Sequence, residues 1–183
     1  MNLDINVINF MSEIKCVPLD YFFKFFTHLG DFGFLYILIG ILFLFFKKTR
    51  KTGATILLSL IFCGILGNLI LKPTIARIRP YDRLNLPLKI KPPTDFSFPS
   101  GHTYGAFAVA GSIHFTKVFK SLPFFIVAAI ISVSRIYFTV HYPSDVLAGV
   151  VMGMILSYVS NKIVNKFYNS NGKFNFRNKF YKF

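Results

Sequence analysis

The sequence predicts an all-α fold: an integral membrane helical bundle with about five transmembrane helices, preceded by N-terminal interfacial helices. Hydrophobic residues make up 54% of the 183 residues, and the mean hydropathy is +0.54. Charged residues account for only 15%, whereas soluble domains carry about 25%. Phenylalanine alone occurs 24 times. A water-soluble domain of this size could not bury so much apolar surface, so the composition indicates a membrane protein.

Five apolar runs are the predicted membrane spans. Some of them are shorter than the roughly 20 residues that a spanning helix needs. Flanking residues can lengthen them, because lysine and arginine side chains at helix ends reach the interface. In the last run, Gly149 and Gly153 form a GxxxG pattern, which lets helix backbones approach closely in lipid. The five runs are residues 32–46, 54–71, 103–119, 123–139 and 146–164.

The N-terminal segments are apolar but too short or too charged to be clear spans. Residues 2–15 carry apolar side chains at near-helical spacing, which predicts an interfacial amphipathic helix. Residues 19–29 are aromatic, with Lys24 in the middle, and predict a second helix that is interfacial or half-inserted. Gly30, with Gly33 close behind it, marks a break before the first run.

A long polar stretch, residues 72–100, separates the second run from the third. It contains six prolines, which exclude a membrane span and predict a loop with room for a short helix. The last residues are rich in asparagine, lysine and phenylalanine and predict a basic, mobile or surface-bound tail. The predicted organisation is N-terminal interfacial helices (1–30), a transmembrane domain (31–165) and a basic C-terminal tail (166–183).

The distribution of basic residues predicts the orientation in the membrane. The formal net charge is +14, and the basic residues lie between apolar runs, which argues against a nucleic-acid partner. Twelve of them fall on one side of the predicted bundle and seven on the other. The positive-inside rule places the 47–51 turn and the C-terminus in the cytoplasm. The loops 72–100 and 135–145 then both face outward.

Three polar clusters fall in these outward loops. The first is Lys72, Arg77, Arg79 and Pro80, and the second is Pro99-Ser100-Gly101-His102. The third runs from Ser134-Arg135 through His141 to Asp145. Arginine matches the geometry of phosphate oxygens, and amide groups at the start of a helix attract anions. The residue types therefore predict an anion-binding site, and no metal-ligand cluster is evident.

Two histidines could carry chemistry at this site. An imidazole titrates near neutral pH, so His102 and His141 can each serve as nucleophile or acid. Asp145 follows His141 by four residues, in the predicted first turn of the last span. It could accept a hydrogen bond from one His141 nitrogen and leave the other nitrogen free to attack. His28 and His114 are outside such patterns and are interpreted as structural; the role of Arg77 is left open.

These motifs resemble the three-part signature of the type 2 phosphatidic acid phosphatase (PAP2) superfamily. The matching residues are Lys72-x6-Arg79-Pro80, Pro99-Ser100-Gly101-His102 and Ser134-Arg135-x5-His141-x3-Asp145. The resemblance implies that His141 is the nucleophile and forms a phosphohistidine, that Asp145 orients it, and that His102 protonates the leaving oxygen. It implies no metal and no other cofactor. It also implies a phosphate site formed by Lys72, Arg79, Ser100, Gly101 and Arg135.

The resemblance makes a lipid phosphate the expected substrate and membrane lipids the expected partners. Undecaprenyl pyrophosphate is favoured, because a compact bundle with an outward site resembles bacterial members that recycle this carrier. A phosphatidylglycerophosphate or lipid A phosphatase is the alternative. The expected location is the bacterial inner membrane, as a multi-pass protein. A non-enzymatic lipid carrier or channel and a soluble acid phosphatase of the same superfamily are weaker hypotheses, and the oligomeric state is not predicted.

Overall fold

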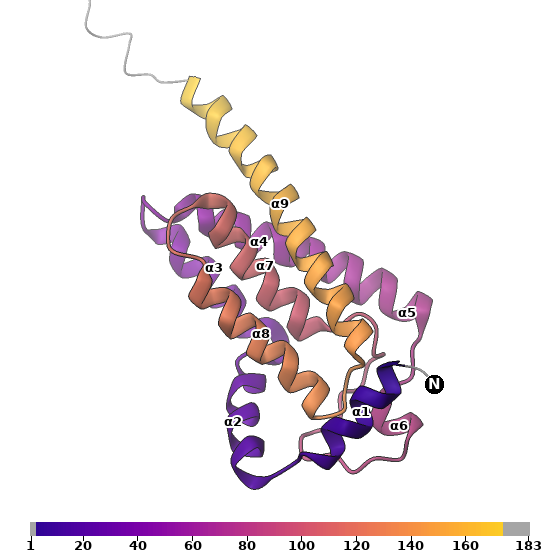
Figure 1. The fold of residues 1–183 in the computed structure, drawn as a ribbon. Helices are drawn as coiled ribbons and strands as arrows, with labels where there is room; N and C mark the ends of the chain where they lie inside the picture. Colours follow the sequence, from indigo (N-terminus) through magenta and orange to yellow (C-terminus); the bar gives the residue numbers. More distant parts are fainter. Residues whose placement is uncertain (1–2, 174–183) are drawn as a thin grey trace, which may run out of the picture.

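The computed structural model describes residues 3–173, and within this range the secondary structure is helical, without strands (Figure 1). The sequence-based prediction of an all-α bundle is therefore confirmed. The elements are α1 (Leu3–Glu13), α2 (Val17–His28), a 3-10 turn η1 (Asp31–Gly33), α3 (Phe34–Phe45), α4 (Arg50–Cys63), a π-helix η2 (Gly64–Leu71), α5 (Lys72–Ile75), α6 (Pro80–Arg83), α7 (Gly101–Thr116), α8 (Leu122–Tyr137) and α9 (Pro143–Lys173).

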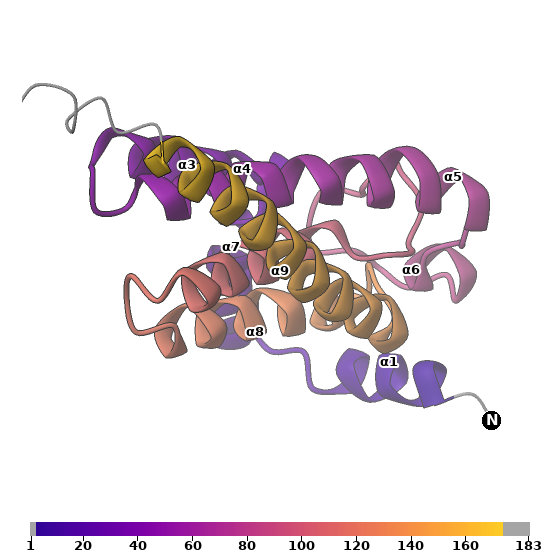
Figure 2. The same cartoon turned by 90° about the horizontal axis from the view of Figure 1, so that it is seen from above.

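Helix α7 is the centre of the bundle. Figure 2 shows it between the α3–α4 hairpin and α8, with α9 crossing it. Ten of its sixteen residues are buried, and most are small or hydroxylated, as expected for helices packed closely in lipid. The contact with α9 is tight at the predicted GxxxG. A Cβ added to Gly153 would lie 2.6 Å from the carbonyl oxygen of Tyr104, and one added to Gly149 would lie 3.0 Å from that of Ser100.

The second predicted span is a longer helix than the hydropathy pattern indicates. Helix α4 continues without a break through η2 and α5 to Ile75, where Ala76 adopts a left-handed conformation with φ 47°. The loop expected from residue 72 therefore begins four residues later. This extension matters for the site, because it puts Lys72 on a rigid helical end instead of a flexible loop.

One other predicted boundary falls inside a helix. Helix α9 is continuous from Pro143 to Lys173, so the expected border between domain and tail at residues 165 and 166 falls inside a helix. The rest of the predicted tail lies outside the described residues. At the N-terminus, both predicted helices are present, and each packs against α8. Helix α1 also contacts α9, so it is a docked part of the bundle.

Membrane-spanning character is clear for part of the described chain. Three helical segments, Val17–Phe45, Arg50–Arg83 and Pro143–Asn169, are long and apolar enough to cross a membrane, and α8 is a shorter apolar helix. Large apolar side chains stay exposed along α3, α4, η2 and α9, as expected for a surface that faces lipid. The expected number of about five spans stays a prediction.

The helix ends that carry the polar motifs meet at one end of the bundle. Figure 1 shows α5, α6 and the start of α9 together at this end, whereas the α3–α4 and α7–α8 connections lie at the opposite end. The start of α7 and the end of α8 complete the polar end. The arrangement explains how clusters separated by whole helices can form one site.

Candidate active site

His141 lies in the short connection between α8 and α9, where two backbone bonds to the Arg135 carbonyl oxygen hold the chain. Its side chain is buried, with Nδ1 3.6 Å from Asp145 Oδ2 and Nε2 3.3 Å from an Arg79 nitrogen. Burial lowers the pKa of His141 to about 3, although the neighbouring Asp145 carboxylate acts in the opposite direction. The imidazole is therefore neutral at physiological pH, and an Nε2 that accepts from Arg79 carries the lone pair that a nucleophile needs.

Asp145 lies behind His141 in the first turn of α9, where the helix dipole stabilises a carboxylate. Its carboxylate is fully buried, and Oδ2 accepts hydrogen bonds from the Ser97 hydroxyl and from the Tyr142 backbone nitrogen, the latter at 2.9 Å. Its other oxygen pairs with Arg77. The sequence placed Asp145 beside His141, but it gave no indication that Ser97 or Arg77 would hold the carboxylate.

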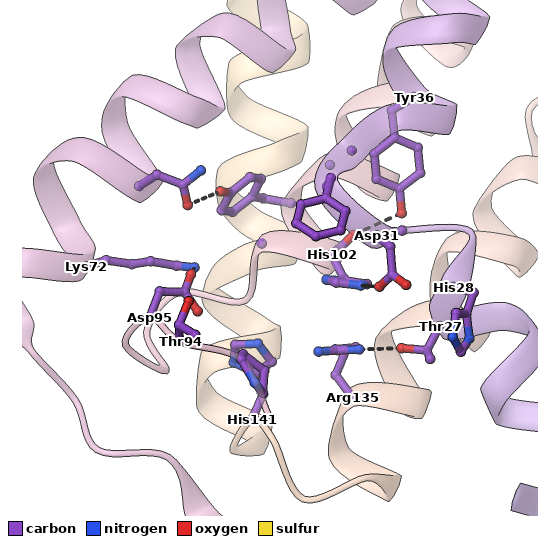
Figure 3. A pocket seen from close by; sticks show the side chains of 18 of the residues that line it. Thr27, His28, Asp31, Tyr36, Lys72, Thr94, Asp95, His102, Arg135 and His141 are labelled. Carbon is purple, nitrogen blue, oxygen red and sulfur yellow. Dashed lines mark hydrogen bonds and ion pairs between the residues drawn. The ribbon is translucent and has the colours of Figure 1, made fainter. Parts of the chain in front are cut away.

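The predicted phosphate ligands come from three directions. Lys72 lies at the end of the long helix, Arg79 just before α6, and Arg135 in the last turn of α8. All three are buried and line one cavity, together with Gly101 and both candidate histidines. Figure 3 shows Lys72, Arg135 and the two histidines around this cavity. Arg135 donates to Thr27 through one terminal nitrogen, while its Nε has no hydrogen-bond partner. A buried guanidinium with a free donor beside two more cations is suited to bind an anion.

Two predicted site residues do not line this cavity: Asp145, which lies behind His141, and Ser100. Ser100 is fully buried at the N-cap of α7, and its Oγ accepts a hydrogen bond of 3.0 Å from the Thr103 hydroxyl. Its backbone nitrogen donates to the Asp145 carbonyl oxygen at 3.2 Å. In this arrangement Ser100 joins α7 to α9. Its role as a phosphate ligand stays a prediction.

His102 lies in the first turn of α7 and faces a carboxylate that the sequence analysis did not identify. Its Nε2 is 3.1 Å from Asp31 Oδ1 (Figure 3). Asp31 belongs to η1, a turn in which Phe32 and Gly33 both have positive φ. A Cβ at Gly30 would collide with the His102 ring, so this turn fits closely around the imidazole. From the sequence, Gly30 and Gly33 indicate only a helix break. These two glycines on either side of Asp31 are the one sequence signal that points to a tight turn here.

Asp95 is a second acidic group missed by the sequence analysis. Its carboxylate pairs with Lys72 and lies 2.6 Å from an Arg79 nitrogen. Burial alone would raise the pKa of Asp95, but the hydrogen bond and charge of Lys72, together with those of Arg79, lower it. Asp95 is therefore an anion that pairs with two of the predicted phosphate ligands, Lys72 and Arg79. Nothing in the spacing of the motifs pointed to it, because it lies in the proline-rich loop.

The cavity has a volume of about 710 Å³, and its lining combines polar and apolar residues. Ile37, Leu60 and Gly64 line it together with the cations and imidazoles. His28, interpreted as structural, also reaches this cavity. Among the described residues, no group of three or more histidine, cysteine, aspartate or glutamate side chains is arranged to hold a metal ion. A charged headgroup and an apolar chain could thus be accommodated together.

A bundle of apolar helices whose cavity is lined by two imidazoles and three phosphate-matching cations fits a membrane-embedded phosphatase. The model of the PAP2 superfamily matches residues 51–169, and the chain belongs to this superfamily. It is thus a membrane lipid phosphatase, as the motifs predicted.

Curated relatives and solved structures agree with this assignment. An undecaprenyl-diphosphatase of Sulfolobus acidocaldarius is 35% identical over 74% of this chain and 67% of its own length. Phosphatidylglycerophosphatase B of Bacillus subtilis is 36% identical over 73% of this chain and 69% of its own. The crystal structure of a transmembrane PAP2-type phosphatidylglycerolphosphate phosphatase from Bacillus subtilis superposes with a TM-score of 0.74 at 28% identity, covering 89% of this chain and 85% of that one.

Proposed function

We propose that this protein hydrolyses undecaprenyl pyrophosphate to undecaprenyl phosphate and inorganic phosphate through a phosphohistidine at His141. The observation that carries the proposal is that His141, His102, three buried cations and several apolar residues line one cavity. The undecaprenyl-diphosphatase activity named for the Sulfolobus relative supports this choice of substrate.

His141 is the proposed nucleophile. Its Nε2 lone pair attacks the terminal phosphorus in line, the P–N bond forms, and the bond from phosphorus to the bridging oxygen breaks. Asp145, on the Nδ1 side of the ring, stabilises the positive charge that develops on the imidazole. The buried position of the ring favours a neutral histidine before attack, so no proton has to be removed first.

His102 is the proposed general acid. It gives its proton to the departing oxygen, and Asp31 at 3.1 Å keeps the ring oriented. Burial and the charge of Arg135 lower the pKa of His102 to about 4, against the opposite effect of Asp31, so the ring takes up its proton when the anionic headgroup is bound beside it. The neutral His102 then takes a proton from water as that water attacks the phosphohistidine. The P–N bond breaks, phosphate leaves, and both histidines return to their starting states.

The cations stabilise the phosphoryl group during transfer. Lys72, Arg79 and Arg135 converge on the cavity from three helix ends, so their charge is in place before the reaction. Such preorganised charge is worth most where phosphoryl charge is redistributed in the transition state. The amide of Gly101 at the start of α7 adds a donor from the helix N-terminus. The reaction is proposed to need no metal ion.

The apolar residues of the cavity lining suit the polyprenyl chain. Ile37 of α3 and Leu60 and Gly64 of the long helix line the same cavity as the cations, on helices that also expose apolar side chains. A substrate whose tail stays in the bilayer can then present its headgroup sideways to the site. We further propose that the protein is a multi-pass protein of the bacterial inner membrane, with its active site extracytoplasmic and its C-terminus cytoplasmic, since basic residues favour the opposite end.

Phosphatidylglycerophosphate is the second candidate substrate, favoured by the name of the Bacillus subtilis relative. Lipid A phosphate is the other alternative that shares this chemistry. A non-enzymatic lipid carrier is the remote candidate, and turnover by purified protein separates it from all phosphatases.

A substrate panel tests the proposal. The detergent-solubilised protein is incubated with each of the three lipids, without added metal, and phosphate release is measured. We expect the highest kcat/KM with undecaprenyl pyrophosphate, and loss of turnover in folded His141→Asn and His102→Asn proteins. Preference for another lipid would change the substrate assignment, and turnover by folded His141→Asn would exclude the mechanism.

A further inference from the structure

Arg77 lies between two carboxylates from opposite ends of the chain. One terminal nitrogen pairs with Asp145, and the other lies 2.7 Å from Asp4 Oδ2 on α1. The guanidinium also stacks on the Tyr142 ring at 3.9 Å. Arg77 is absent from the lining of the cavity that holds the phosphate ligands. Its contacts therefore place it behind the reacting groups, not against the substrate.

Asp4 joins α1 to the start of α9. Its Oδ1 accepts a 3.0 Å hydrogen bond from the Ser144 backbone nitrogen, and its Oδ2 accepts from the Ser144 hydroxyl. The same hydroxyl accepts from Arg77 at 2.7 Å. Burial alone would raise the pKa of Asp4, whereas the hydrogen bonds from Ser144 and Arg77 lower it, so this carboxylate stays charged. The Asp4 carboxylate lies at the N-terminus of α9, where the helix dipole also favours an anion.

The network fixes the orientation of the Asp145 carboxylate. Arg77 pairs with Oδ1, so the carboxylate plane cannot tilt without weakening an ion pair, and one oxygen stays on the Nδ1 side of His141. The charge of Asp4 also affects Asp145 through Arg77. Asp4 shares the positive charge of Arg77, which leaves Asp145 negative enough to stabilise a positively charged imidazole during attack.

From this geometry we propose that Arg77 is a positioning residue for the Asp145–His141 pair, and that α1, through Asp4, is a docked part of the catalytic apparatus. This inference rests on the proposed function, because it assigns a task only if His141 is the nucleophile. It gives α1 a role beyond the interfacial helix expected from its amphipathic pattern.

Asp4→Asn is the decisive variant. Asparagine has the same shape and can still accept from the Ser144 backbone, so the protein should fold, but the ion pair with Arg77 is lost. Glu13→Gln is the matched control, because it removes an exposed acid from the same helix. With full-length protein in detergent, we expect Asp4→Asn to lower kcat and the rate of phosphohistidine formation by roughly tenfold, with KM nearly unchanged.

Variants of Arg77 show whether Arg77 and Asp4 act together. Arg77→Gln should lower kcat at least as much as Asp4→Asn, and the double variant should be no worse than Arg77→Gln alone, since both remove one network. Arg77→Lys should recover only part of the activity, because lysine lacks the fork that contacts two carboxylates. Thermal unfolding of each variant separates lost catalysis from lost folding.

Several outcomes would overturn the inference. Asp4→Asn could behave like Glu13→Gln, the two losses could add in the double variant, or Arg77→Gln could raise KM at constant kcat, as expected for a phosphate ligand. Loss of folding in Asp4→Asn would make the contact merely structural. A wild-type protein without turnover, or an active His141→Asn protein, would instead remove the proposed function on which the inference depends.

Discussion

Replacing Asp31 with asparagine tests how His102 is made into an acid. The substitution keeps the shape of the side chain but removes the charge that lies 3.1 Å from His102 Nε2. A hydrogen bond to a charged group contributes about 1.5–3 kcal/mol. The Asp31 side chain is 42% exposed, so solvent screening reduces this value to about 1–2 kcal/mol. We therefore expect a loss of kcat of roughly fivefold to thirtyfold on a substrate that needs the proton.

The assay compares two leaving groups. A long-chain alkyl monophosphate releases an alkoxide, which requires a proton in the transition state, whereas p-nitrophenyl phosphate releases a stable phenolate. Asp31→Asn should slow the first reaction and leave the second nearly unchanged. His102→Asn should give the same pattern with a larger loss. Asp82→Asn, an exposed acid in α6 outside the cavity lining, is the matched control and should affect neither substrate.

The reasoning about Asp31 would be refuted by equal losses with both leaving groups, because that result would indicate damage to the site as a whole. It would also be refuted if Asp31→Asn had full activity with the alkyl substrate. The comparison uses only ratios within one protein preparation, so differences in the active fraction cancel.

Three further predictions concern anion competition, packing and metal dependence. Asp95→Asn should let inorganic phosphate inhibit at a several-fold lower concentration, since Asp95 competes for Lys72 and Arg79; weaker inhibition would mean that Asp95 holds these cations in place. Gly153→Ala should destabilise the protein by about 1–3 kcal/mol in thermal unfolding, because its Cβ would lie 2.6 Å from a backbone oxygen of α7. Gly64→Ala, with open space around it, is the control and should lower stability far less. Chelation with EDTA should leave phosphate release unchanged, and activity restored by a divalent ion after EDTA would contradict a metal-free reaction.

The features that the sequence predicted well are those governed by local composition and spacing. Apolar runs of near-membrane length gave the helical class, and Gly149 and Gly153 gave the close contact between α7 and α9. One cavity is lined by five motif residues, because each lies at or next to a helix end on the same side of the bundle: Lys72, Arg79, His102, Arg135 and His141.

The features that the sequence analysis missed depend on how distant segments pack. Asp4 and Arg77 are 73 residues apart, and Asp31 and His102 are 71 apart, so no periodic pattern connects them. Hydropathy also placed the end of the second helix too early. Lys72 is charged and Pro73 follows it, yet the helix continues to Ile75, since proline at a helical position can be accommodated where the preceding turn is a π-helix.

Identification of the covalent intermediate tests the central claim most directly. The detergent-solubilised protein is mixed with undecaprenyl pyrophosphate labelled in its terminal phosphate, quenched within the first turnover, and the labelled residue is located by mass spectrometry. We predict an acid-labile, alkali-stable phosphoryl group on His141 that disappears as free phosphate forms and is absent from His141→Asn. Turnover without label at any time, or label on a residue other than His141, would contradict the account.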